Sequence, residues 1–277
     1  MKFAFCTCVQ LGLSCIEEIY RIGGKLDLLI TLDNNLAKKK SGRIYLDSFA
    51  NRHNIPLLKI KNINDEVVIT TLRGMGIDYL FIIGWSQIAK TVLLNTPNKG
   101  CLGMHPSLLP IGRGRAAIPW AIIKGLPKTG VTMFKLVEEV DAGDIIGQIE
   151  ILIEKDETAT TLYQKVNEAH IELISKYYFD IENGNITTIK QDEAEATYWE
   201  ERKPSDGEIF GYMDTQYVEK LIRALALPYP GAFYYLNNKK IIVREASFSN
   251  ERLRDISFKL LNGYLNPILY EVENKVL

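Results

Sequence analysis

The fold is decided by one stretch of the chain, Gly100-Cys-Leu-Gly-Met-His-Pro-Ser-Leu-Leu-Pro-Ile-Gly-Arg-Gly-Arg115. Its apolar start predicts a buried strand that ends near Met104 and leaves His105 in a loop, which two prolines stiffen by fixing their own φ angles. A helix is expected directly after the loop, at residues 116–124. A strand, a rigid polar loop and a helix in this order are typical of the carboxyl edge of a parallel sheet, where open α/β folds place their ligands.

His105 has a candidate partner in Asp141, which lies where a second apolar run meets a glycine turn. The interval between them has room for one helix and one strand, so both residues can return to the same edge of the sheet. A carboxylate beside an imidazole favours the protonated ring, which can stabilise a developing oxyanion or relay a proton. Without Asp141, a loop histidine is explained equally well as a cap or a satisfied polar residue.

Two motifs follow each other along the chain, His105-Pro-Ser-Leu-Leu-Pro110 and then Asp141-Ala-Gly-Asp144. Together with segments at 83–88, 130–134, 203–209 and 221–233, they resemble the formyltetrahydrofolate-dependent formyltransferases. That family pairs an Asn-x-His-x-Ser-Leu-Leu-Pro loop with an Asp-x-Gly-Asp loop at the spacing found here. The resemblance covers residues 70–235 well and the first 70 loosely, and its separated motifs in the correct order make it specific.

This resemblance implies both a fold and an activity. The fold is a doubly wound α/β domain with a mostly parallel, Rossmann-like sheet and a small α+β carboxyl-terminal part. We expect the catalytic domain at residues 1–190, and a linker with a small subdomain at 191–277. The implied reaction is transfer of a formyl group from N10-formyltetrahydrofolate, the co-substrate, to a primary amine.

The resemblance also implies roles for individual residues. His105 and Asp141 form the expected catalytic pair, and Asp144 is expected to hold the loop beside them. The folate is expected against two loops, one made of Trp85, Ser86, Gln87 and Ile88 and the other containing Val140, Asp141, Gly143 and Asp144. The amine substrate is expected near Thr7, Gln10, Met104, Arg113 and Arg115.

Alternatives stay open for several of these residues. Trp85 either stacks on the pterin or simply packs in the core. The turn at 7–12 is equally well explained as plain structure. Arginine suits a substrate diphosphate because its planar fork donates two bonds at once, but Arg113 or Arg115 can equally pair with a surface carboxylate.

Gly103 is a departure from the family, because the catalytic Asn of the family falls on this position. One oxyanion donor is therefore missing, or another side chain such as Gln87 or Ser107 supplies it. The structural alternative is that Gly103 relieves crowding between the strand and the following loop.

Composition and charge argue against several classes of protein. The 277 residues are 47% hydrophobic and carry a net charge of −1, which gives no general attraction to nucleic acid or to an anionic membrane. No apolar run approaches the length of a membrane span, and the first residues do not form a signal peptide, so we expect a cytoplasmic protein. The cysteines lie in apolar surroundings and predict reduced core residues and no metal site; they are Cys6, Cys8, Cys15 and Cys101.

The amine acceptor follows from charge and layout. A tRNA acceptor needs a basic surface, because affinity for nucleic acid rests on phosphate contacts, and the net charge and the short segment after Phe233 argue against it. The layout is most similar to the sugar N-formyltransferases, which act on nucleotide-linked amino deoxysugars for bacterial surface glycans such as lipopolysaccharide and O-antigen; a homodimer is compatible with this interpretation. The alternatives are a methionyl-tRNA formyltransferase and a non-catalytic relative that binds folate or a nucleotide sugar.

Further expectations concern segments away from these motifs. Residues 38–43 predict a basic loop, and residues 158–178 predict a long amphipathic helix on which His170 has a surface or cap role. The polar composition of 191–204 is typical of a linker. Asn237-Asn238 predicts the turn of a hairpin.

Overall fold

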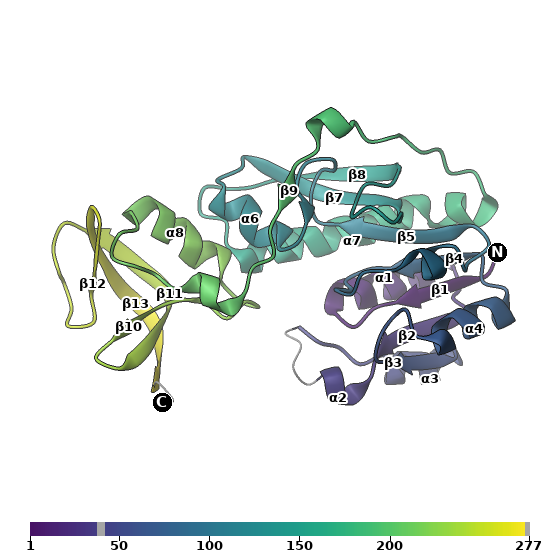
Figure 1. Ribbon diagram of the computed structural model, residues 1–277, viewed down its shortest axis with the longest axis horizontal. Helices are drawn as coiled ribbons and strands as arrows, with labels where there is room; N and C mark the ends of the chain where they lie inside the picture. Colours follow the sequence, from purple (N-terminus) through teal and green to yellow (C-terminus); the bar gives the residue numbers. More distant parts are fainter. Residues whose placement is uncertain (38–41, 275–277) are drawn as a thin grey trace. The chain divides into compact units, whose positions relative to one another are not determined.

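The computed structural model describes residues 1–37 and 42–274, so residues 38–41 of the expected basic loop lie outside the described residues (Figure 1). The chain divides into two compact units. The first comprises residues 1–114, 130–151 and 165–198, and the second comprises residues 115–129, 152–164 and 199–277. The chain therefore enters the second unit three times.

A seven-stranded sheet forms the centre of the first unit, with the strand order β3-β2-β1-β4-β5-β7-β8. Its strands are β1 (Phe3–Cys6), β2 (Leu28–Leu32), β3 (Leu57–Ile60), β4 (Tyr79–Ile82), β5 (Gly100–His105), β7 (Lys128–Lys135) and β8 (Ile145–Leu152). The pairs from β3 through β5 are parallel, whereas β5 and β7 are antiparallel. The mostly parallel α/β sheet predicted from the sequence is therefore confirmed.

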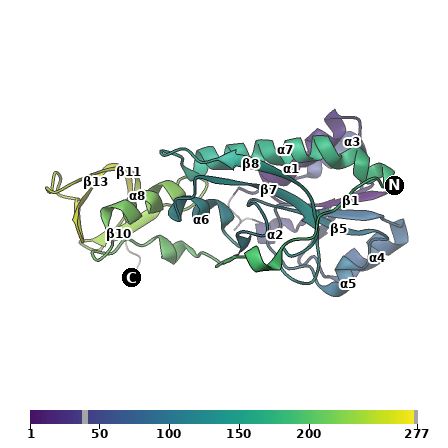
Figure 2. The ribbon, with the colours of Figure 1, turned by 90° about the horizontal axis from the view of Figure 1, so that it is seen from above.

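Helices cover both faces of this sheet because its central strands are apolar on both sides. The helices are α1 (Gln10–Arg21), α2 (Asn34–Ala37), α3 (Asp47–His53), α4 (Glu66–Met75), α5 (Thr91–Leu94) and most of α7 (Ala159–Asn183). Cys6 of β1 shares an apolar cluster with Leu72 of α4. Phe3, three residues before Cys6 in β1, packs its ring 5.3 Å from that of Tyr178 in α7, and Figure 2 shows α7 lying along β7 and β8. Parallel strands buried on both faces are typical of doubly wound folds.

Two element boundaries differ from those predicted, and both involve site residues. β5 includes His105 as its last residue, because the backbone of His105 is still paired with Thr132 of β7. α1 begins at Gln10, directly after its N-cap residue Val9, so the expected turn at 7–12 is reduced to residues 7–9. His105 therefore belongs to the sheet, and Gln10 belongs to a helix.

An antiparallel sheet packed with helices forms the second unit. Its strands lie in the order β10-β11-β13-β12. The elements are α6 (Ala117–Ile123), α8 (Thr215–Ala224), β10 (Ala232–Leu236), β11 (Lys239–Ser249), β12 (Phe258–Leu260) and β13 (Gly263–Asn274). The β10–β11 hairpin turns at Asn237 and Asn238, whose φ angles of 49° and 59° are those of the predicted two-residue turn. The small α+β carboxyl-terminal part is confirmed.

Short elements join these parts of the chain. They are β6 (Arg113–Gly114), β9 (Tyr198–Trp199) and the 3₁₀ helices at Glu193–Glu195 and Pro204–Gly207. Within residues 1–37 and 42–274, none of the helices combines the length and the apolar character needed to cross a membrane. The four cysteines are buried with free thiols, and burial raises the pKa of the Cys101 thiol to about 12, so this thiol stays protonated in the core.

Candidate active site

His105 is held at the end of β5 with its ring in a defined orientation. Its Nε2 atom lies 2.8 Å from the carbonyl oxygen of Gly112, and its Nδ1 atom lies 3.5 Å from Oδ2 of Asp141. Because a carbonyl oxygen can only accept, Nε2 carries a proton, and Nδ1 is the ring position that can gain or lose one beside the carboxylate. The residue is buried at the end of the strand, which corrects the expectation that it lies in the following loop.

Asp141 reaches His105 by a route different from the one predicted. β7 runs antiparallel to β5, and Lys135 at its end lies opposite Leu102, while His105 lies opposite Thr132. The loop at 138–144 therefore leaves β7 beside the start of β5 and must fold back to bring its carboxylate to the histidine. The structure brings His105 and Asp141 together as predicted, but the strand pairing alone would not place them side by side.

The backbone of Asp141 has a conformation that few residues adopt. Its φ is 54°, in the left-handed region where Asp and Asn are enriched. Its Oδ2 atom accepts a hydrogen bond of 2.9 Å from the N–H of Gly114. Its backbone carbonyl oxygen accepts one of 2.8 Å from Nε2 of Gln191. Both the backbone and the side chain of Asp141 are thus fixed by neighbouring segments.

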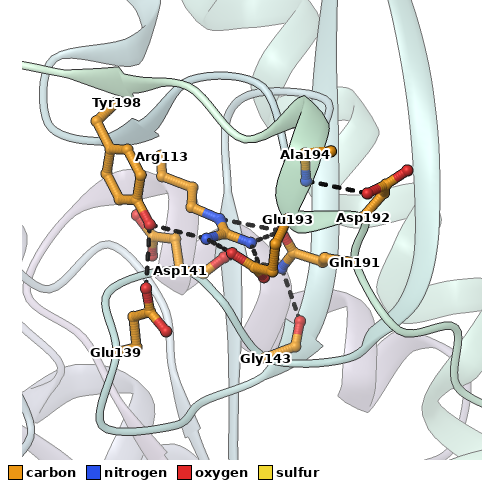
Figure 3. Close-up of polar contacts among 9 residues, drawn as sticks. All are labelled: Arg113, Glu139, Asp141, Gly143, Gln191, Asp192, Glu193, Ala194 and Tyr198. Carbon is orange, nitrogen blue, oxygen red and sulfur yellow. Dashed lines mark hydrogen bonds and ion pairs between the residues drawn. The ribbon is translucent and has the colours of Figure 1, made fainter.

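Arg113 lies beside this loop in a network of polar side chains (Figure 3). Its guanidinium donates to Oε1 of Gln191 (3.2 and 2.9 Å), to both carboxylate oxygens of Glu193 (2.9 and 2.7 Å) and to the hydroxyl of Tyr198 (2.8 Å). Arg113 is fully buried, and the hydrogen bonds that it donates to Glu193 raise the pKa of its guanidinium further above the ordinary value. In the structure, the Arg113 guanidinium thus binds protein groups, whereas the sequence analysis considered a substrate phosphate as its partner.

The loop at 85–88 is tied to the segment after β3 by Gln87. The Oε1 atom of Gln87 accepts from the N–H of Ile63 (2.8 Å), and its Nε2 atom donates to the carbonyl oxygen of Lys61 (2.9 Å). These bonds engage the amide oxygen of Gln87 and its amide nitrogen with backbone groups. Trp85 packs against two apolar clusters of the core, whereas Ile88 is 62% exposed.

Gly103 makes room for a neighbouring leucine. A Cβ atom at this position would lie 2.7 Å from Cδ2 of Leu136, closer than real Cβ atoms approach a neighbour. The second substitute donor, Ser107, is buried and donates its hydroxyl to the carbonyl oxygen of Ile111 at 2.7 Å. The contacts therefore favour the structural explanation, in which Gly103 relieves crowding.

The loop at 138–144 is a tight turn that requires its glycine. A Cβ atom on Gly143 would lie 1.7 Å from the carbonyl oxygen of Lys135. The carbonyl oxygen of Asp144 accepts from the N–H of Lys135 (2.9 Å), and Oδ2 of Asp144 accepts from the hydroxyl of Thr188 (3.4 Å). These contacts fit a role of Asp144 in holding the loop. Val140 is 43% exposed and presents an apolar side chain to solvent.

Comparison with known families identifies the proteins to which these motifs belong. Residues 34–177 match the sequence model of the family described as formyl transferase, and residues 202–257 match that of the formyl transferase C-terminal domain. The chain belongs to the formyl transferase family. The resemblance inferred from the motifs is confirmed.

Several relatives of this chain are known. It is 32% identical over 275 residues to the bifunctional polymyxin resistance protein ArnA of Wigglesworthia glossinidia brevipalpis, a match that covers 99% of this chain but only 41% of that protein. A solved 4-N formyltransferase from Francisella tularensis is 26% identical, with a TM-score of 0.66, and 85% of this chain and 93% of that chain are covered. An N-formyltransferase from Helicobacter canadensis, solved with folinic acid and dTDP-3-aminofucose, is 17% identical and shares the fold, with a TM-score of 0.71 and coverage of 96% and 99%.

The residues that the sequence analysis expects to bind the amine substrate have different surroundings. Thr7 and Met104 are buried. Gln10 is the exposed first residue of α1. Arg115 belongs to the second unit, where it forms an ion pair with Glu201, as in the alternative considered from the sequence. Of this set, Gln10 and Arg115 present polar groups to solvent, whereas Thr7 and Met104 are enclosed by the core.

The segment at 191–198 is a part of the site that the sequence patterns do not indicate. Its polar composition predicts a linker, but Gln191 is buried and bonded to the Asp141 loop, and the segment belongs to the first unit. The sequence gives only an indirect signal that this segment belongs to the site. A buried cation such as Arg113 requires a counter-ion, but no local pattern says that Glu193 supplies it.

His170 is buried in α7 rather than at the surface, which corrects the predicted role. Its Nδ1 atom lies 2.8 Å from the carbonyl oxygen of Val166, one helical turn earlier. Burial lowers the pKa of His170 to about 4, so the ring is neutral at neutral pH. His170 is therefore a packed residue of the core.

Proposed function

We propose that this chain transfers the formyl group of N10-formyltetrahydrofolate to the amino group of a nucleotide-linked amino deoxysugar. The observation that carries the proposal is the pair of His105 and Asp141, with Nδ1 and Oδ2 3.5 Å apart, in a chain of the formyl transferase family. In this proposal the reaction takes place in the cytoplasm. Its product serves bacterial surface glycans such as lipopolysaccharide with its O-antigen.

The reaction needs a group that handles protons beside the formyl carbonyl. As the amine nitrogen bonds to the formyl carbon, the carbonyl oxygen gains charge; the bond to N10 then breaks, and the proton lost by the amine ends on N10. His105 can donate from Nδ1 to the charged oxygen or shuttle this proton, because its Nε2 atom is engaged with Gly112. A carboxylate in the position of Asp141 can accept the amine proton through water.

The two loops expected to hold the folate have surfaces that suit a pterin. Ile88 and Val140 are exposed apolar side chains that a flat ring can cover, and burial of such surface is favourable. Gln87 fixes the first loop through its bonds to backbone groups, and Asp144 fixes the second. These contacts support folate as the formyl donor, with Trp85 and Ser86 as further members of the first loop.

The choice of acceptor rests on relatives and charge. The enzyme from Helicobacter canadensis was solved with dTDP-3-aminofucose, and the one from Francisella tularensis is a 4-N formyltransferase. The net charge of −1 gives no general attraction to the phosphates of tRNA. The exposed Gln10, the first residue of α1, is the proposed contact to the nucleotide sugar.

A product assay tests this proposal. The purified chain is incubated with N10-formyltetrahydrofolate and, in separate reactions, with dTDP- and UDP-linked 3-amino and 4-amino sugars, and the products are identified by mass spectrometry. We expect one of these sugars to gain a formyl group. Formylation of methionyl-tRNA in its place, or folate binding without any product, would overturn the proposal in favour of the respective alternative. The proposal includes a homodimer, which light scattering of the same preparation tests.

A further inference from the structure

The residues on either side of Arg113 contact both members of the catalytic pair. The carbonyl oxygen of Gly112 lies 2.8 Å from Nε2 of His105, and the N–H of Gly114 donates to Oδ2 of Asp141 at 2.9 Å. The backbone position of Arg113 therefore sets the relative position of the histidine ring and the carboxylate. Contacts that fix the Arg113 side chain therefore also fix the position of the His105 ring relative to the Asp141 carboxylate.

Gln191 connects the Arg113 side chain to the Asp141 loop (Figure 3). Its Oε1 atom accepts from Nε and Nη2 of Arg113, and its Nε2 atom donates to the carbonyl oxygens of Asp141 (2.8 Å) and Gly143 (2.7 Å). Because a guanidinium can only donate, the amide oxygen must face Arg113 and the amide nitrogen must face the loop. Arg113 thus orients the donor that holds the Asp141 backbone.

The Asp141 loop needs such a restraint for two reasons. The loop folds back from the end of β7, since Lys135 lies opposite Leu102 and not opposite His105. Its central residue also holds a φ of 54°, and a strained backbone persists only where the surroundings hold it in place. The two hydrogen bonds from Gln191 to adjacent parts of this turn supply that restraint.

Hydrogen bonds to Glu193 and Tyr198 hold the Arg113 side chain in the conformation that orients Gln191. Glu193 accepts two hydrogen bonds from the buried guanidinium and acts as its counter-ion. The hydroxyl of Tyr198 accepts a third and donates to Oε1 of Glu139 at 3.2 Å. Since these bonds are intramolecular, the arrangement exists before any substrate binds.

We propose that Arg113 and Gln191 are positioning residues that hold the Asp141 carboxylate against His105 for formyl transfer. The inference rests on the proposed function and deepens it. Neither residue touches the reacting groups; both act through the loop at 138–144. The competing explanation is that the network only stabilises the fold, and the two predict different kinetics.

Gln191→Glu separates these explanations in the full chain. The glutamate keeps an oxygen acceptor for Arg113, but it replaces the amide nitrogen with an oxygen that repels the carbonyl groups of Asp141 and Gly143. We expect kcat to fall about 100-fold, as for a catalytic group misplaced by about an ångström, with KM for both substrates near the wild-type values. Gln148→Glu is the matched control, because Nε2 of Gln148 also donates to two protein oxygens, on Leu109 and Thr132, and its kcat should stay near wild type.

A second measurement does not depend on turnover. The sequence has three histidines, His53, His105 and His170, so the imidazole ¹H–¹⁵N NMR spectrum is simple to assign. In Gln191→Glu we expect the His105 signals to shift while those of His53 and His170 stay in place. Unchanged His105 signals with wild-type kcat would overturn the proposal, and so would a shift of all three histidines, which would indicate a general change of fold.

Arg113→Lys tests the proposal if Gln191→Glu does not fold. Lysine keeps the charge but loses the planar fork that bonds Gln191 and Glu193 together, and it should give the same loss of kcat and the same selective NMR shift. Arg223→Lys is its control, since Arg223 also bonds Glu219 through two nitrogen atoms. If the wild-type chain formylates no nucleotide sugar, the proposed function fails, while the NMR comparison still decides whether the network positions the pair. Wild-type His105 signals in Arg113→Lys would overturn the inference.

Discussion

At the scale of single residues, the two aspartates of the loop at 138–144 have different contacts. Oδ2 of Asp141 faces Nδ1 of His105, whereas Oδ2 of Asp144 accepts from Thr188. Asp141→Asn keeps the shape and tolerates the left-handed backbone but removes the charge, so turnover should fall about 100- to 10,000-fold. Asp144→Asn should keep most of its turnover. Steady-state kinetics on both variants, with circular dichroism as the folding control, would reverse the assignment if only Asp141→Asn were active.

Gly103 gives a second prediction at this scale. Because a Cβ atom there would lie 2.7 Å from Cδ2 of Leu136, Gly103→Asn should lower the free energy of unfolding by about 1–3 kcal/mol, measured in urea. The loss should be smaller in a Leu136→Ala background, where the space is free. A stable Gly103→Asn protein with raised turnover would instead show that the position accepts the Asn of the family and regains an oxyanion donor.

At the scale of elements, His170 gives α7 a pH-dependent contribution to stability. Its pKa is about 4 in the folded chain, against an ordinary value of 6.5. Between these values the unfolded chain binds a proton that the folded chain does not, so the free energy of unfolding falls as the pH falls from 6.5 to about 4, by up to about 3 kcal/mol. Above pH 6.5 the ring is neutral in both states and contributes no pH dependence. Urea unfolding of His170→Gln across this range should show a weaker pH dependence, and an equal dependence in both proteins would contradict the prediction.

The helices and strands also differ in how well a sequence pattern predicts them. Phe3–Cys6 and Tyr79–Ile82 are continuous apolar runs, so composition alone indicates buried strands. The start of α1 gives no such signal, because its N-cap residue Val9 has no side chain that caps a helix. The bond between Gln191 and Arg113 joins residues 78 positions apart, and a contact of that kind leaves no periodic pattern in the sequence.

At the scale of the whole molecule, the contact between His105 and Asp141 depends on more than the sheet. The motifs single out His105 and Asp141 because each follows an apolar run, and both residues lie within the range 34–177 that matches the family model. The antiparallel pairing of β5 with β7 then places the end of β7 opposite Leu102, so the loop and its partners at 112–114 and 191 must complete the site. A chain with the same strands but without the hydrogen bonds from Gly114 and Gln191 would not hold the Asp141 carboxylate in this position.

Formyl transfer by His105 is tested most directly by the turnover of His105→Gln. Glutamine can still donate to the carbonyl oxygen of Gly112, so the loop keeps its partner, but it cannot carry the proton that Nδ1 handles. With saturating N10-formyltetrahydrofolate and the accepted nucleotide amino sugar, the release of tetrahydrofolate should slow about 100- to 10,000-fold while the circular dichroism spectrum stays the same. Near-wild-type turnover in the folded variant would contradict the assignment of formyl transfer to His105.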